Sequence, residues 1–179
     1  MALIEIGEAQ LEQGDLASAR KSFEEARALD RPYNFARPEI EMAFARLNLA
    51  SGRAEDAAAK ARSAMNTFTA AGREGDRLQA GALLARALIA GGDIGEASRV
   101  LGQLPSPDGL SLPIAAVVEY RVARCFVIAN TGRRAEAGRT IDKVAEEASH
   151  LGLIPLAKEA RLAREEIMKT TNLSHASSN

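Results

Sequence analysis

The strongest constraint on the fold is a six-residue signature that recurs at a nearly fixed interval. The signature is Gly-[Asp/Arg]-x-x-[Ser/Asp/Glu]-Ala, and its four copies begin at Gly14, Gly52, Gly92 and Gly132. Successive copies lie 38, 40 and 40 residues apart. Repeats of this length are typical of stacked supersecondary units, which bury their apolar faces against neighbouring copies. The chain is therefore predicted to be a repeat array.

Each copy of the signature has the chemistry of a helical hairpin turn. Apolar residues with helical periodicity precede each glycine, which can adopt the left-handed conformation that ends a helix. Asp15 and Asp93 follow their glycines and are suited to cap the next helix, whereas Arg53 and Arg133 are not. The signature alanine comes five residues after the glycine. A side chain this small lets two antiparallel helices approach closely.

The pattern resembles the tetratricopeptide repeat (TPR), whose hairpins combine a small residue in the first helix, a turn glycine, and small and aromatic residues in the second. In the first copy Pro32 comes one residue later than the pattern places its proline, and the matching residues are Leu3, Ile6, Gly7, Gly14, Asp15, Ala19, Phe23 and Ala26. The resemblance covers about residues 1–150. It implies an all-α, right-handed α-solenoid of four TPR-like helical hairpins plus a C-terminal capping helix. The long period is similar to that of long-helix TPR variants in bacterial regulators.

The expected hairpins span about residues 2–30, 36–71, 74–104 and 111–151, followed by a capping helix at 154–170 and a flexible tail at 171–179. Within the hairpins the predicted helices are 2–13 and 15–30, 36–51 and 53–71, 74–91 and 93–104, and 111–131 and 133–151. The capping helix should bury a side that includes Leu162 and Ile167. One irregular loop is expected around Pro105, Pro107, Gly109 and Pro113.

Composition argues against several classes of function. The chain has 23 Lys+Arg and 24 Asp+Glu, so it lacks the basic surplus of a general nucleic-acid binder. One cysteine and two histidines cannot form a thiolate zinc cluster or a multi-histidine metal site, and no cofactor is expected. No apolar stretch reaches the roughly 20 residues of a membrane span, and no signal peptide is visible. A cytoplasmic location is expected.

The sequence shows no catalytic constellation, so the chain is not expected to be an enzyme. Cys125 lies in an apolar run at a helix-packing position, where a thiol behaves as a small hydrophobe. His150 is expected at a helix end without a paired nucleophile. Adjacent glutamates diverge by about 100° on a helix, so they cannot face one substrate. Such pairs are Glu24-Glu25, Glu146-Glu147 and Glu165-Glu166.

The candidate functional surface is the concave face, formed by the first helix of each hairpin. Arg46, Arg86 and Phe126 each lie six residues before a turn glycine, and Met42 lies one turn before Arg46. Two guanidinium groups on neighbouring hairpins could bind carboxylates, with Met42 as an adaptable apolar contact. The alternative is that arginine is simply the preferred surface base of a chain with 18 Arg and 5 Lys.

The resemblance implies a non-catalytic protein–protein interaction module. We expect the scaffold or sensor part of a bacterial signalling or regulatory protein, which binds an acidic peptide or protein partner and neither nucleic acid nor membrane. The alternative is a structural element that forms homodimers through exposed solenoid ends, where Leu3, Ile4 and Ile6 would lie uncovered.

Overall fold

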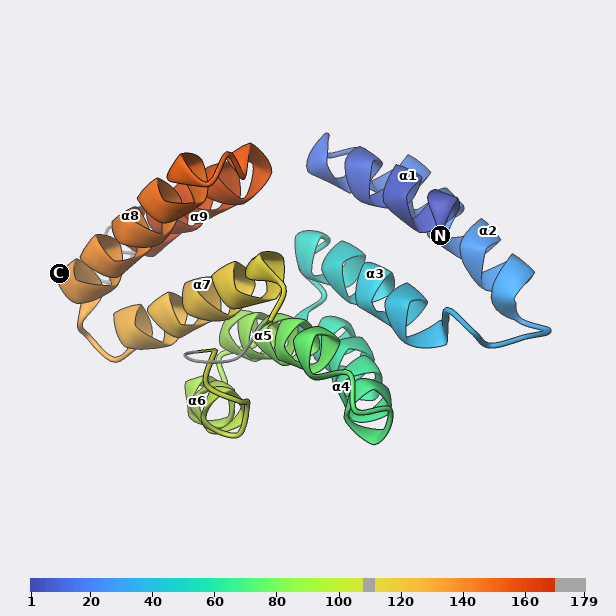
Figure 1. The fold of residues 1–179 in the computed structure, drawn as a ribbon, viewed down its shortest axis with the longest axis horizontal. Helices are drawn as coiled ribbons and strands as arrows, with labels where there is room; N and C mark the ends of the chain where they lie inside the picture. Colours follow the sequence, from blue (N-terminus) through green and yellow to red (C-terminus); the bar gives the residue numbers. More distant parts are fainter. Residues whose placement is uncertain (108–111, 170–179) are drawn as a thin grey trace, which may run out of the picture. The chain divides into compact units, whose positions relative to one another are not determined.

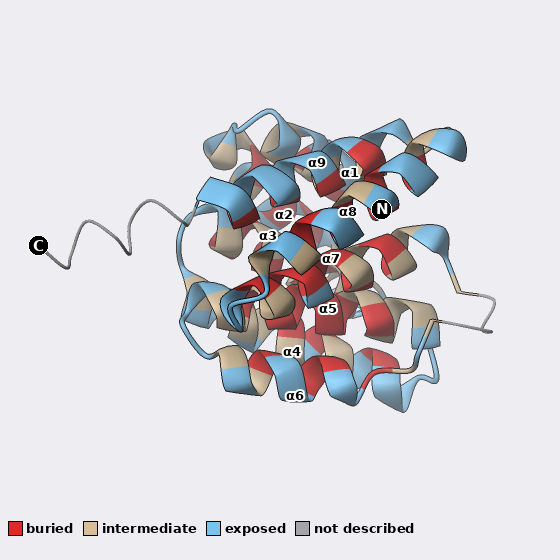
Figure 2. Ribbon diagram, turned by 90° about the vertical axis from the view of Figure 1, so that its left-hand side faces the viewer, coloured by how far each residue is buried: buried red, intermediate tan, exposed pale blue. Residues whose placement is uncertain are grey.

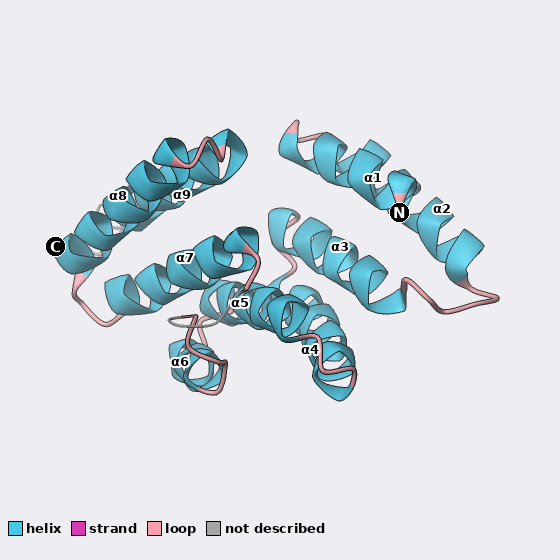
Figure 3. Ribbon diagram, viewed as in Figure 1, coloured by secondary structure: helices cyan, strands magenta, loops and turns pink. Residues whose placement is uncertain are grey.

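The described residues of the computed structural model, 1–107 and 112–169, form helices joined by turns, and no strand occurs among them (Figure 3). The helices of this part of the chain are α1 (Ala2–Glu12), α2 (Leu16–Asp30), α3 (Arg37–Ala50), α4 (Ala54–Ala70), α5 (Glu74–Ala90), α6 (Ile94–Gly102), α7 (Ile114–Asn130), α8 (Arg134–His150) and α9 (Ile154–Lys169) (Figure 1). The all-α prediction is confirmed.

The chain divides into two compact units, Met1–Ser106 and Pro107–Asn179. The first unit contains the hairpins α1–α2, α3–α4 and α5–α6, and the second contains α7, α8 and α9. Within the first unit each helix packs on the next, and the first helices of successive hairpins also touch, α1 with α3 and α3 with α5. This alternate-helix contact is the packing expected of stacked hairpins.

The turn glycines adopt the predicted left-handed conformation. Gly14, Gly52, Gly92 and Gly132 have φ values of 80°, 73°, 87° and 88°. The Asp15 carboxylate accepts a hydrogen bond from the Ser18 backbone N–H at 3.0 Å, which lowers the pKa of Asp15. Asp93 caps α6 in the same way, whereas Arg53 and Arg133 make no side-chain cap.

The same turn also joins successive elements where the signature does not occur. Gly72 links α4 to α5 with φ 67°, and Gly152 links α8 to α9 with φ 72°. The helix bounds predicted from the sequence place a break at both glycines, although neither of them begins a copy of the signature. Glycine turns of this kind therefore occur at six of the connections between described helices, and not only at the four that carry the signature.

Helix boundaries agree with the sequence to within about three residues, a normal scatter for helix ends. The largest difference is at α7, which begins at Ile114 because Leu112 precedes a proline and is kept out of the helical conformation. Residue 111, Gly109, residue 170 and the predicted tail 171–179 lie outside the described residues.

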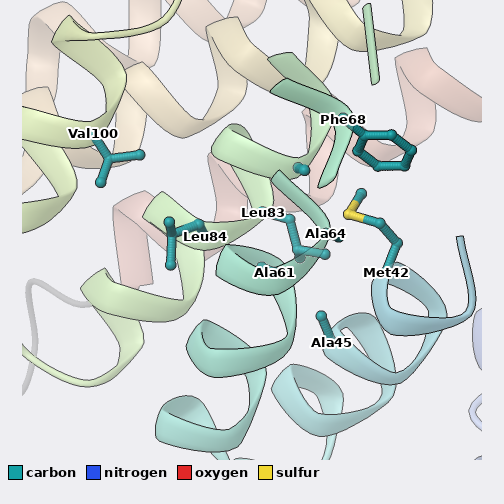
Figure 4. Packing of buried hydrophobic residues seen from close by; sticks show 9 residues of the cluster. Met42, Ala45, Ala61, Ala64, Phe68, Leu83, Leu84 and Val100 are labelled. Atoms are coloured by element: carbon teal, nitrogen blue, oxygen red, sulfur yellow. The ribbon is translucent and has the colours of Figure 1, made fainter. Parts of the chain in front are cut away.

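The signature alanines form the contacts between paired helices. Ala19, Ala57, Ala97 and Ala137 are each 0% exposed. In the first unit a cluster from α3, α4, α5 and α6 surrounds Ala61 and Phe68 (Figure 4). The buried residues lie on the helix sides that face other helices, and the exposed residues lie on the outer sides (Figure 2).

In the second unit, α9 covers α7 and α8 as the predicted capping helix. Its buried residues are Ala157, Ala160, Ala163 and Ile167. Leu162, expected on this side, is instead 56% exposed. The alanines make the closer contact because their short side chains bring α9 near its neighbours.

Candidate interaction surface

Equivalent positions on the first helices of successive hairpins lie next to each other. Glu8 on α1 and Arg46 on α3 both lie six residues before a turn glycine. Arg46 Nη1 contacts Glu8 Oε1 at 2.8 Å. Since these residues are one repeat apart, the ion pair confirms the register that the glycine spacing predicts for these two hairpins.

Arg86 occupies the same position on α5, and α3 contacts α5. Arg46 keeps 25% of its side chain exposed and Glu8 keeps 39%, so solvent reaches the pair. The first unit therefore carries a row of ionic groups on α1, α3 and α5, formed by Glu8, Arg46 and Arg86. We call this the ionic row.

The two apolar residues predicted for the surface are buried. Met42 is 4% exposed, and its side chain extends toward Phe68 within the α3–α4–α5 cluster (Figure 4). Phe126, on α7 of the second unit, is 6% exposed. Met42 therefore supports the packing beneath the ionic row instead of lying on the surface beside Arg46.

A second ionic group joins α3 to the start of α5. Arg73 Nη1 contacts Glu39 Oε1 at 2.7 Å, and Arg73 Nε contacts Asp76 Oδ2 at 2.8 Å. The guanidinium also lies 4.7 Å from the centre of the Phe68 ring. The hydrogen bond with Glu39 raises the pKa of Arg73 above its ordinary value. Sequence reasoning missed Arg73, although it follows a turn glycine just as Arg53 and Arg133 do.

In the second unit, side chains of α8 and Arg121 of α7 line an open hollow of about 450 Å³. Arg121 Nη1 contacts Glu147 Oε2 across it at 2.5 Å. The hollow has mixed charge and places His150 at its wall, at the end of α8 as predicted. Its lining residues are Arg121, Thr140, Lys143, Val144, Glu146, Glu147 and His150.

The single cysteine, Cys125, lies in the core of the second unit. Cys125 is 0% exposed, and burial raises the pKa of its thiol to about 11, against the opposing charge of Arg124. A thiol of this kind stays protonated and is a poor nucleophile. Within residues 1–107 and 112–169, no group of three or more His, Cys, Asp or Glu side chains is placed to hold a metal ion.

The Cys125 thiol is expected to resist modification in the native protein. Its raised pKa keeps the thiolate fraction low at neutral pH, and burial excludes the reagent. Ellman's reagent should react with it slowly in buffer and at once in concentrated urea. Rapid stoichiometric labelling of the native protein would contradict the buried position.

Stacked antiparallel helical hairpins with glycine turns and alanine contacts define a TPR-like helical repeat fold. Two solved structures have the same fold. One is a Podosopora anserina putative kinesin light chain with nearly identical TPR-like repeats, at 16% identity and a TM-score of 0.62, covering 96% of this chain and 95% of that chain. The other is a variant of that protein with one substitution, at 17% identity and a TM-score of 0.62, covering 98% of this chain and 92% of that chain.

No protein-family model and no curated protein matches this chain. The likeness to the two solved structures therefore shows the fold. In the part of the chain that the structure describes, the helices are too short or too polar to cross a membrane.

Proposed function

We propose that the chain is a non-catalytic protein–protein interaction module that binds an acidic partner segment on the face formed by α1, α3 and α5. The observation that carries this proposal is the 2.8 Å contact between Arg46 and Glu8. It supports a surface on which consecutive hairpins align their charged groups. TPR-like repeat folds typically serve as scaffolds for protein partners, which agrees with this assignment.

The ionic row fits a partner that carries carboxylates. The Arg46–Glu8 pair is partly exposed, and surface ion pairs contribute only about 0–1 kcal/mol, so a partner carboxylate can compete with Glu8 for Arg46. Equivalent positions on packed helices lie roughly 8–10 Å apart. An extended segment advances about 3.3 Å per residue, so carboxylates three residues apart would match Arg46 and Arg86. Met42 and Phe126 would act indirectly, by fixing the helices that present the surface.

The proposal also includes the kind of larger protein in which such a module would act. A module of this kind fits the cytoplasmic scaffold or sensor part of a bacterial regulatory protein, where binding of a partner is relayed to an attached effector. This assignment rests on the long-helix TPR pattern of the sequence.

Self-association is the second candidate function. Ile6 is 49% exposed on α1, Leu151 is 60% exposed at the end of α8, and Ile154 is 62% exposed at the start of α9. These apolar side chains support contacts between copies of the chain. Ile4, expected on the same uncovered edge, is only 6% exposed because it packs with Phe23 in the core of the first unit.

Substitution of the ionic row tests the proposed binding. A labelled peptide rich in aspartate should bind better than a lysine-rich peptide, and its affinity should fall as salt is added. Arg46→Ala and Arg86→Ala should each weaken it, on the order of tenfold for the loss of a charged hydrogen bond. Glu8→Gln should strengthen it, because it removes a competing carboxylate. Fluorescence anisotropy of the labelled peptide measures its affinity for the parent and for the three variants.

Arg139→Ala is the control, because Arg139 is an exposed arginine of α8 in the second unit. It should bind like the parent. Equal binding of acidic and basic peptides, or parental affinity in both Arg46→Ala and Arg86→Ala, would exclude the ionic row as the binding surface.

A further inference from the structure

The link between α2 and α3, residues 31–36, carries the two exposed aromatic side chains of the protein. Tyr33 is 68% exposed and Phe35 is 85% exposed. The chain has seven aromatic residues, two Tyr and five Phe, and the other five are at most 7% exposed. Those five are Phe23, Phe44, Phe68, Tyr120 and Phe126. A chain that buries the rest of its aromatic residues thus leaves two adjacent ones in solvent.

The two rings are held in one arrangement. Tyr33 and Phe35 stack with centroids 6.1 Å apart and ring planes within 4° of parallel. Between them Asn34 has a φ of 55°, a left-handed conformation that asparagine tolerates. The Asp30 carbonyl accepts hydrogen bonds from the N–H groups of Tyr33 and Asn34, and its carboxylate accepts one from the Ala36 N–H at 2.9 Å. These hydrogen bonds therefore fix the backbone that carries the two rings.

Stacking of the hairpins does not require a link of this length. The α4–α5 connection, residues 71–73, joins two hairpins of the same unit with three residues, whereas the α2–α3 link has six. The longer link extends beyond the ends of the helices that it joins (Figure 1). Its additional residues add exposed apolar surface without adding to the core.

Positive charge flanks the rings. Arg31 and Arg37 lie at the two ends of the link, and both are exposed. Across the described residues, neither guanidinium has a carboxylate within ion-pair distance. Asp30, next to Arg31, accepts the Ala36 N–H, and Glu39, two residues after Arg37, pairs with Arg73. The surface of the link is therefore aromatic at its centre and cationic at its margins.

We propose that Tyr33, Phe35, Arg31 and Arg37 form a docking site for an extended, proline-containing acidic segment of a partner protein. Exposed aromatic faces bind the flat rings of proline, and a polyproline II segment loses little conformational entropy on binding. Glutamate or aspartate on either side of the proline complements the two arginines. This site is separate from the ionic row on α1, α3 and α5.

Tyrosine fluorescence gives a direct test, because the chain has no tryptophan. In a Tyr120→Phe background, Tyr33 is the remaining tyrosine. A short peptide of alternating proline and glutamate should protect Tyr33 from quenching by acrylamide. The matched peptides with alanine for proline, or lysine for glutamate, should protect it weakly. Backbone amide shifts of Tyr33 and Phe35 in the parent chain report the same titration without the Tyr120 substitution.

Phe35→Ala should weaken the peptide about tenfold, as expected for an aromatic anchor, and should leave the circular dichroism spectrum unchanged because the side chain is exposed. Arg31→Gln combined with Arg37→Gln should weaken it and reduce its salt dependence. Leu162→Ala, which truncates an exposed apolar side chain of α9, is the control. Arg46→Ala should leave this binding unchanged.

Three results of the peptide experiments would overturn the proposal. They are the absence of protection by the proline–glutamate peptide, equal protection by the lysine peptide, and parental affinity in Phe35→Ala. Concentration-dependent dimerisation of the parent that Phe35→Ala abolishes would also overturn it, because the rings would then form a contact between copies of this chain.

Discussion

Ala61→Glu is expected to destabilise the first unit by about 3–5 kcal/mol, the usual cost of a buried charge without a partner. Ala61 is 0% exposed on α4 and lies in the cluster that joins α3, α4, α5 and α6 (Figure 4). The cluster consists of apolar residues, so a carboxylate there has no cation to pair with and too little space. Urea unfolding followed by circular dichroism measures the loss.

The matched control is Ser63→Glu, two residues along the same helix at an exposed position. Its free energy of unfolding should stay within about 0.5 kcal/mol of the parent, as for most surface substitutions. Equal destabilisation by the two variants would mean that Ala61 does not face the interior. The alignment that places it in the core, four residues after the signature alanine Ala57, would then be wrong.

The features that the sequence predicted are those with a local physical cause. A glycine that must adopt positive φ, a capping aspartate and an alanine between close helices are each visible in a few residues. Gly14, Asp15 and Ala19 illustrate all three, and the structure confirms each of them. The helix bounds follow from the same signals, because the turns fix where each helix ends.

The position of a side chain on a central helix was harder to predict. The helix α3 buries eight of its fourteen residues because α1, α2, α4 and α5 all contact it. On such a helix, the position of a residue around the helix axis does not by itself predict whether its side chain is buried or exposed. Met42 was therefore expected on the concave face but lies in the core, whereas Arg46, one turn later, reaches Glu8 at the surface.

Contacts that depend on tertiary structure or on loop conformation were not predicted, because no local sequence signal marks them. The pair Glu39–Arg73 requires two hairpins to come together, whereas the stacking of Tyr33 on Phe35 depends on the backbone conformation of a single link. The backbone conformation that carries Tyr33 and Phe35 depends on the hydrogen bonds to Asp30 and on the left-handed Asn34. The composition of the link does not reveal either feature.

Phe23→Ala is the second substitution with a large expected effect, a loss of about 3–5 kcal/mol for a buried phenylalanine. Phe23 is 0% exposed on α2 and packs edge to face against Phe44 of α3, with ring centroids 5.8 Å apart. The ring also lies so close to Gly7 of α1 that it leaves no space for a side chain at residue 7. A Cβ at Gly7 would lie 2.3 Å from Phe23 Cε1 and 2.6 Å from Cδ1.

The same contact predicts that the effect of Gly7→Ala changes sign with residue 23. In the parent, the methyl group overpacks the buried Phe23 ring, at a cost of about 1–3 kcal/mol. The gain in helix propensity, about 1 kcal/mol, offsets only part of this cost. After Phe23→Ala the ring is absent and the methyl group enters the vacated space. Gly7→Ala should then stabilise the protein by up to about 1 kcal/mol.

Urea unfolding of the parent, both single variants and the double variant gives the coupling energy between the two positions. A positive coupling, with opposite signs for Gly7→Ala in the two backgrounds, shows that the Phe23 ring is the reason for glycine at this position. If Gly7→Ala has the same effect in both backgrounds, the ring does not limit the approach of α1 to α2. The small residue would then act through the helix backbone alone, and the hairpin contact inferred from the TPR-like pattern would lose its support.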